Sequence, residues 1–159
     1  TMQLNLQPEM IEDIFREAIH HLGRNKRKHN ISMHLEDDLL MANMDVRLII
    51  QVLVNLINNA IKYTPENSNI SLNARRVENK ILIEVQDDGN GVLHPDQLFE
   101  MFYTENNRGG DTRRGMGLGL SLCKSIIQSH GGTIWVENVT PHGACFKFVL
   151  DAVEVKLYE

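Results

Sequence analysis

Residues 45–62 read DVRLIIQVLVNLINNAIK, and this stretch decides the fold because it is the clearest helix in the chain. Its apolar residues recur at helical spacing, which predicts a helix with one buried side. These residues are Val46, Ile49, Leu53, Leu56, Ile57 and Ala60. Asn55, Asn59 and Lys62 are spaced i, i+4 and i+7, so they gather on the other side. Carboxamide oxygens can bind a hard cation and a lysine can meet a phosphate, but on the helix alone a plain solvated side is the commoner explanation.

The composition is that of one globular domain. The 159 residues are 42% hydrophobic and 23% charged, and the formal net charge of −5 argues against a nucleic-acid binder. We expect a single domain over residues 1–159, with its core within residues 3–151. No apolar run has the length of a membrane span, and the first residues lack a signal-peptide pattern. Cys123 and Cys145 lack metal-ligand spacing, which predicts reduced cysteines in the core.

The elements on either side of the central helix alternate between strands and helices. Asp45 is a suitable N-cap for this helix, and Thr64-Pro65 ends it. Before it we expect a short edge strand over residues 3–8, a helix over 9–22 and two strands within 31–43. After it we expect paired strands at 68–78 and 79–88, a helix at 120–130 and paired strands at 133–139 and 143–152. This order predicts an α+β two-layer sandwich with a mixed, mostly antiparallel sheet.

The first motif after the helix is Asp87-Asp88-Gly89-Asn90-Gly91, at the end of a predicted strand. A carboxylate that leaves a buried strand can accept a hydrogen bond from an exocyclic amine such as that of adenine. The glycines would let the backbone pass close to a flat ring. Taken alone, however, the DG and NG pairs are more typical of a simple hairpin turn.

The second motif, GMGLGL at residues 115–120, stands directly before a predicted helix. Glycines that lead into a helix N-terminus expose free N–H groups and favour an anion. The spacing is not that of a Rossmann fingerprint, and no Walker lysine follows the glycines. The long polar segment before this motif contains Arg113 and Arg114. Loops of this length are usually either functional lids or disordered, and arginines in a lid can close on a polyphosphate.

Together and in this order, the motifs resemble the N, G1, F and G2 boxes of the histidine-kinase ATP-binding domain, part of the Bergerat ATPase superfamily. The matching stretches are NLINNAIKYTP (55–65), DDGNGV (87–92), LFEMFY (98–103) and GMGLGL (115–120). The closing strands HGGTIWVEN and GACFKFVL are also similar. Within the family, QVLVNLINNAIKYTP and HGACFKF are most similar to the potassium-responsive Kdp-type sensor kinases. The resemblance covers nearly the whole chain and implies a sheet of about five strands with three helices on one face.

The resemblance also implies roles for individual residues. Asn55 and Asn59 would hold Mg²⁺ and through it the ATP phosphates, and with Lys62, a phosphate contact, they would form the catalytic set. Asp87 would bind the adenine amine. The remaining nucleotide-binding positions would be Tyr63, Gly89, Gly91, Arg113, Arg114, Gly115, Gly117, Leu118 and Gly119. The aromatic residues Phe99 and Phe102 would anchor the lid by packing.

The reaction depends on Asn55, the first residue of the N box. In gyrase, Hsp90 and mismatch-repair ATPases of this superfamily a glutamate at that position activates water, which an asparagine cannot do. The resemblance therefore implies a protein histidine kinase. It would transfer the γ-phosphate of ATP to a histidine on the dimerisation domain of the same protein, and from there to a response regulator receiver domain. The alternatives are a serine kinase of the anti-sigma type and a module that only senses ATP.

The seven histidines bear on which parts of such a kinase are present. In the family the acceptor histidine precedes an acidic residue, and none of the seven does so here. We therefore expect all seven to be surface or loop histidines. We also expect the chain to be an excised catalytic domain without its dimerisation segment. It would be a cytoplasmic part of a membrane-anchored sensor kinase, without nucleic-acid or direct membrane contact.

Overall fold

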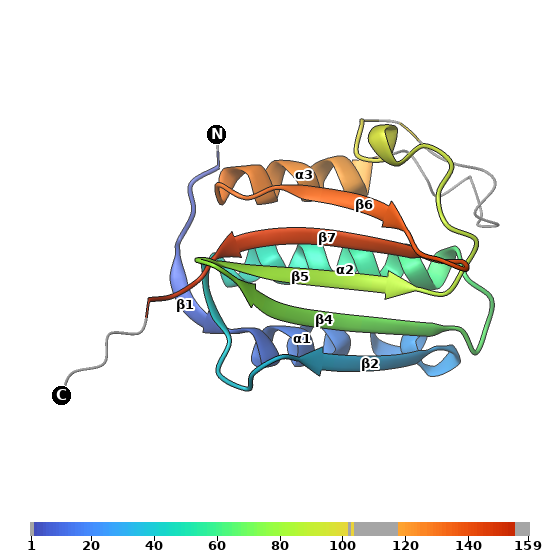
Figure 1. Ribbon diagram of the computed structural model, residues 1–159, viewed down its shortest axis with the longest axis horizontal. Helices are drawn as coiled ribbons and strands as arrows, with labels where there is room; N and C mark the ends of the chain where they lie inside the picture. Colours follow the sequence, from blue (N-terminus) through green and yellow to red (C-terminus); the bar gives the residue numbers. More distant parts are fainter. Residues whose placement is uncertain (1, 102, 104–117, 155–159) are drawn as a thin grey trace.

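The computed structural model describes residues 2–101, 103 and 118–154, without the side chains of residues 25–27 and 118 (Figure 1). Its first half contains β1 (Gln7–Met10), α1 (Ile11–His21), the 3₁₀ helix η1 (Gly23–Lys28), β2 (Asn30–Leu35), β3 (Met41–Met44) and α2 (Val46–Lys62). The second half contains β4 (Asn69–Val77), β5 (Lys80–Asp87), the 3₁₀ helix η2 (Pro95–Gln97), α3 (Leu118–Ser129), β6 (Ile134–Asn138) and β7 (Ala144–Asp151). This is the element order that the sequence predicts.

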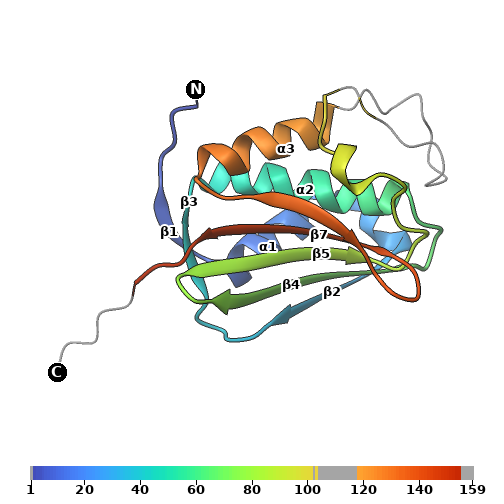
Figure 2. The same ribbon diagram turned by 45° about the horizontal axis from the view of Figure 1, so that its top comes forward.

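Within the described residues, five strands form a sheet in the order β2-β4-β5-β7-β6. Only β2 and β4 run parallel, and the other neighbours are antiparallel. Helices α1, α2 and α3 lie on one face of this sheet (Figure 2). The predicted two-layer fold with a mixed, mostly antiparallel sheet is therefore confirmed.

The first strand differs from its prediction. It spans Gln7–Met10 rather than residues 3–8, and it pairs with β3 in a separate two-stranded sheet. Pro8 lies within it, opposite Asn43. A proline is tolerated there because a strand of a two-stranded sheet has an open edge that needs no N–H donor.

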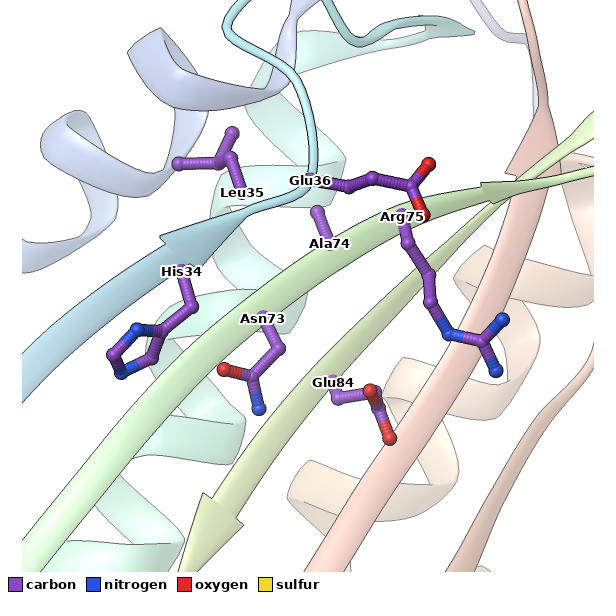
Figure 3. Close-up of a pocket in the computed structure, with 7 residues that line it drawn as sticks. All are labelled: His34, Leu35, Glu36, Asn73, Ala74, Arg75 and Glu84. Atoms are coloured by element: carbon purple, nitrogen blue, oxygen red, sulfur yellow. The ribbon is translucent and has the colours of Figure 1, made fainter.

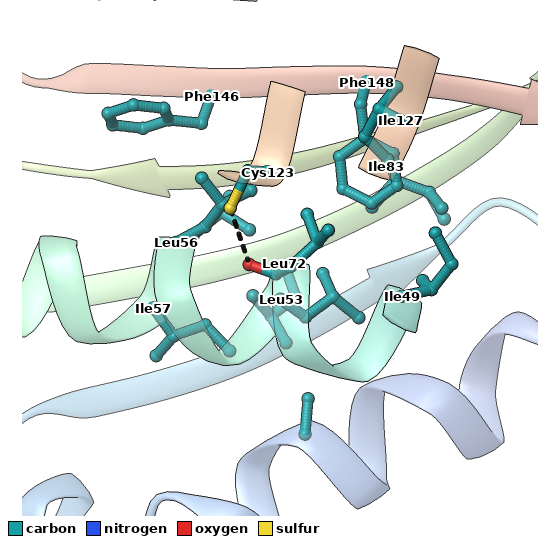
Figure 4. Packing of buried hydrophobic residues seen from close by; sticks show 14 of the residues in the cluster. Ile49, Leu53, Leu56, Ile57, Leu72, Ile83, Cys123, Ile127, Phe146 and Phe148 are labelled. Carbon is teal, nitrogen blue, oxygen red and sulfur yellow. Dashed lines mark hydrogen bonds between the residues drawn. The ribbon is translucent and has the colours of Figure 1, made fainter. Parts of the chain in front are cut away.

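The apolar side of α2 packs against the sheet, with α1 and α3 on either side of the helix (Figure 4). Its buried residues are Ile49, Val52, Leu53, Leu56, Ile57 and Ala60. Burying a side chain of the Leu or Ile type contributes roughly 1.5–3 kcal/mol. This packing fixes the rotation of α2 about its axis, and with it the direction in which Asn55 and Asn59 point.

Helix α3 ends in a turn that only glycine allows. Gly131 has a φ of +77°, and the N–H of Gly132 donates to the carbonyl of Ile127 at 3.0 Å, the pattern of a Schellman motif. A Cβ at Gly132 would lie 2.1 Å from the carbonyl oxygen of Val149. The predicted helix at 120–130 therefore ends at this glycine pair. No helix of the described residues combines the length and apolar character needed to cross a bilayer.

Asp45 occupies the N-cap position of α2 but makes no side-chain capping bond. The Asp45 carboxylate instead accepts the backbone N–H of Asn5 at 3.1 Å. The backbone N–H of Asp45 donates to Nε2 of His130 at 3.0 Å. The Nδ1–H of His130 donates to the carbonyl of Ile126 at 2.8 Å. His130 lies in the turn after α3, as predicted for a loop histidine, but it is only 9% exposed and so is not a surface residue. This network joins the N-terminal segment to both α2 and α3.

We expect Asp45→Asn to destabilise the domain by on the order of 1 kcal/mol at pH 7. The Asn5 N–H holds the pKa of Asp45 below its usual value, against the opposing effect of burial. A lowered native pKa means that the carboxylate stabilises the fold above the unfolded-state pKa, and that this contribution is lost as the pH falls through the native pKa. In urea unfolding, the difference in unfolding free energy between the variant and wild type should shrink as the pH falls from 7 to 2. The exposed Asp38→Asn serves as the control, and a difference independent of pH would contradict the prediction.

Candidate nucleotide-binding site

Asn55 and Asn59 are two half-buried carboxamides on α2. The Oδ1 of Asn59 is shielded from solvent and has no hydrogen-bond partner among the described residues. The Nδ2 of Asn55 lies 3.8 Å from Sγ of Cys123 in α3, and this thiol donates to the carbonyl of Val52 at 3.9 Å (Figure 4). Burial raises the pKa of Cys123 to about 12, so it remains a thiol that can donate. An unpaired buried carbonyl oxygen is costly, which makes Asn59 a candidate ligand for a cation.

The C-terminal end of α2 carries the next two predicted residues. The Nζ of Lys62 lies 4.9 Å from the centroid of the Tyr63 ring, within the range of a cation–π contact. The N–H of Tyr63 donates to the carbonyl of Asn59 at 3.1 Å and so continues the helical hydrogen bonding by one residue. The ammonium group and the aromatic ring therefore lie one turn beyond Asn59.

Asp87 ends β5 and is 2% exposed. Its Oδ1 accepts the N–H of Gly89 at 2.9 Å and the N–H of Ala144 at 3.2 Å. Asp88 belongs to the opposite side of the loop, where its carboxylate accepts the N–H and the side-chain amide of Asn69 at 3.2 and 3.0 Å. The two neighbouring carboxylates are thus separated, and the buried one is fixed in direction by two backbone donors.

The glycines of this loop fit against protein atoms. A Cβ at Gly89 would lie 2.8 Å from Cγ2 of Thr64, and one at Gly91, whose φ is +80°, would lie 2.6 Å from Oδ1 of Asn138. The Asn138 amide also accepts the N–H of Val92 at 2.7 Å and donates to its carbonyl at 2.9 Å. Packing against protein atoms therefore requires a glycine at each position, whether or not the glycine also leaves room for a base.

Sequence reasoning missed the residues that hold this loop from outside the motifs. Besides Asn138, they include His142, whose Nδ1–H donates to the carbonyl of Asp88 at 2.7 Å. A Cβ at Gly143 would lie 2.2 Å from the carbonyl oxygen of Asp87. These residues join β6 to β7, and they reach the loop because β7 lies beside β5 in the sheet. A prediction of the strand order is the one signal that could have found them.

Several predicted residues lie outside the described part of the chain: Phe102, Arg113, Arg114, Gly115 and Gly117. Leu118 begins α3, and Gly119 lies in its first turn, where a Cβ would meet no atom within 4 Å. Phe99 is 7% exposed, and its ring meets that of Phe146 edge to face at 6.0 Å. Phe99 is therefore a buried aromatic residue, and its role as an anchor of the lid stays a prediction.

A shallow hollow of about 280 Å³ lies on the face of the sheet that the helices leave open (Figure 3). Its lining includes His34 of β2, Asn73 and Arg75 of β4 and Glu84 of β5. Helix α2 lies on the other side of the sheet. This hollow is therefore separate from the predicted nucleotide residues.

Those residues gather at one end of the molecule. The C-terminal ends of α2 and β5 and the first turn of α3 lie at the same end of the sandwich (Figure 1). Direct contacts connect them, since Asn55 meets Cys123 of α3 and Gly89 packs beside Thr64. A buried carboxylate suited to an amine, carboxamides suited to a hard cation and a lysine suited to a phosphate thus occur on adjoining elements.

Comparisons with known proteins agree with this arrangement. Residues 44–154 match the family described as histidine kinase-, DNA gyrase B-, and HSP90-like ATPase. The sensor protein KdpD of Clostridium acetobutylicum is 36% identical over 142 residues, which are 88% of this chain and 16% of that protein. The catalytic domain of histidine kinase ThkA is 28% identical, with a TM-score of 0.81 over 93% of this chain and 98% of that one. ThkA in complex with response regulator protein TrrA matches at 28% identity and a TM-score of 0.78, over 93% of this chain and 42% of that one.

The chain thus spans about a sixth of KdpD but nearly all of the ThkA catalytic domain. Its sequence similarity to KdpD agrees with the resemblance to Kdp-type kinases. Its family match covers α2, the Asp87 loop and α3, the elements that carry the predicted site. The chain belongs to the histidine kinase-, DNA gyrase B-, and HSP90-like ATPase family, and membership implies that it binds ATP.

Proposed function

We propose that this chain is the catalytic domain of a sensor histidine kinase. It binds Mg-ATP and presents the γ-phosphate to a histidine on the dimerisation domain of the same protein. The similarity to KdpD and to the ThkA catalytic domain supports this proposal. The substrate histidine would come from another domain, because none of the seven histidines here is followed by the acidic residue that follows the acceptor histidine in the family.

Mg²⁺ fits the residues on α2. The Oδ1 of Asn59 is a buried, unpaired oxygen donor among the described residues, and Asn55 supplies a second carboxamide on the same side of the helix. Oxygen ligands without charge suit Mg²⁺ when the ATP phosphates complete its coordination. The bound ion would neutralise phosphate charge, while Lys62 would add a further positive group at the end of the helix.

The observation that carries the choice of a kinase is Asn55. A carboxamide cannot remove a proton from water, so the site holds no general base at the position where the hydrolases of this superfamily have one. Bound ATP would then await a nucleophile from another domain. Transfer would depend on positioning and on charge stabilisation by the residues around the phosphates.

The partners follow from the same proposal. The solved complex of ThkA with TrrA is a kinase bound to a response regulator, and we propose a receiver domain of that kind as the final phosphate acceptor here. The KdpD relative is named a sensor protein, and we propose that this domain works on the cytoplasmic side of a membrane-anchored sensor.

Mixing the domain with a separately produced dimerisation segment and γ-labelled ATP tests the proposal. We expect label on the segment that is stable in alkali and lost in acid, as a phosphohistidine is, and little label on the domain alone. Acid-stable phosphoserine would support a serine kinase instead. Tight ATP binding without transfer to any segment would support a nucleotide sensor.

A further inference from the structure

We propose that Thr64 positions the adenine-binding carboxylate, and that His29 holds Thr64 in place. The inference rests on the proposed ATP site and assigns two further positioning residues to it. Thr64 follows α2 directly and is 9% exposed, whereas His29 directly precedes β2, 35 residues earlier in the chain. Neither residue is a group that the nucleotide motifs mark as a ligand.

Hydrogen bonds at Oγ1 fix the orientation of the Thr64 side chain. The hydroxyl donates to the carbonyl of Ala60 at 2.7 Å, which uses its single proton. The His29 Nε2, 2.9 Å from the same oxygen, must therefore be the donor in their contact. With Oγ1 held on both sides, the direction of the Thr64 methyl group is also set, because a threonine has one χ1 angle.

That methyl group lies beside Gly89. A Cβ built at Gly89 would come within 2.8 Å of Cγ2 of Thr64, closer than real carbon contacts allow. The N–H of Gly89 in turn donates to Oδ1 of Asp87 at 2.9 Å. A continuous set of contacts thus runs from His29 through Thr64 and Gly89 to the carboxylate that would select adenine.

The His29 ring is held for this contact at a cost. Its Nδ1 is buried and has no hydrogen-bond partner among the described residues. An apolar side chain at this position would avoid that unpaired acceptor, so stability alone gives no reason for a histidine here. Donation from Nε2 to Thr64 is the interaction that an apolar residue could not supply.

The first test is a double-mutant cycle on the methyl group and the glycine. Gly89→Ala should weaken ATP binding by about tenfold or more, because the new methyl group meets Thr64. Thr64→Ser keeps the hydroxyl and removes Cγ2, and alone it should weaken binding only a few-fold. In the double variant most of the loss should be recovered, although the new Cβ remains 3.1 Å from Oδ1 of Asp87. The inference would be overturned if the loss of ATP affinity in the double variant equalled the product of the two single losses. It would also be overturned if Gly89→Ala bound ATP as well as wild type does.

The second test replaces His29 and needs no change in the loop. Glutamine can place its amide nitrogen where Nε2 lies, whereas asparagine places it near Nδ1. His29→Gln should keep the preference for ATP over inosine triphosphate, which has a carbonyl in place of the adenine amine. His29→Asn should lower that preference about threefold or more without lowering Tm in proportion. The exposed His34→Gln is the matched control, and equal behaviour of the two His29 variants would overturn the inference.

These outcomes separate the inference from the proposed function. A wild-type domain that does not bind ATP, or an Asp87→Asn variant with unchanged base preference, would refute the proposed site itself. The role of Thr64 alone would be refuted by a third combination of results. In it, the wild type binds ATP and Asp87→Asn changes the base preference, but the losses of ATP binding free energy in the Gly89 cycle are additive.

Discussion

Asp87→Asn is expected to lower ATP affinity by about 10- to 100-fold, the effect of losing a hydrogen bond to a charged group in a buried site. The Oδ1 of Asp87 is held by the N–H groups of Gly89 and Ala144. In the asparagine variant the carbonyl oxygen must stay with these donors, because an NH₂ group there would face two N–H groups. The side-chain NH₂ would then meet the adenine amine donor to donor.

The same geometry predicts a change of base preference. An NH₂ group suits the C6 carbonyl of inosine triphosphate, so its affinity should stay constant or rise while that of ATP falls. Titration calorimetry with both nucleotides measures the ratio. Asp88→Asn is the matched control, since its carboxylate bonds to Asn69 on the other side of the loop. Equal losses for ATP and inosine triphosphate would mean that Asp87 does not contact the base.

The sequence predicts the elements of this site better than it predicts their supports. Helix α2 could be predicted because its apolar spacing and its burial follow the same period, and the structure begins and ends it at Val46 and Lys62. The Asp87 loop could be predicted because one continuous stretch contains both the strand and its glycines. A local sequence pattern can predict such elements, because the residues that form the pattern are also the residues that interact in the structure.

The supports come from distant parts of the chain. Asn138 holds Val92 across 46 residues, and Ala144 reaches Asp87 across 57. Such contacts exist because β7 lies between β5 and β6, a neighbour relation that no local pattern contains. His130 is a similar case. A histidine after a helix is usually solvated, but this one accepts the N–H of Asp45 from 85 residues away.

Asn59→Ala is the second change with a large expected effect. If Oδ1 of Asn59 is a ligand of Mg²⁺, its removal should lower ATP affinity in the presence of Mg²⁺ by roughly 10- to 100-fold. The loss should be small when EDTA replaces the metal. The fold should not suffer, because the change removes a buried oxygen that has no partner among the described residues. Tm should therefore stay constant or rise slightly.

Asn58→Ala is the matched control, because the same carboxamide is removed from the same helical turn while the unpaired oxygen of Asn59 remains. Calorimetric titrations of ATP with Mg²⁺ and with EDTA give four affinities for the two variants. Only the value for Asn59→Ala with Mg²⁺ should fall far below wild type. An equal loss with and without the metal would show that Asn59 acts on the nucleotide or on the fold directly. A fall in Tm would show that its oxygen already has a structural partner in solution. If the Asn59→Ala variant loses ATP affinity only when Mg²⁺ is present, the unpaired Oδ1 of Asn59 is the oxygen that binds the ion.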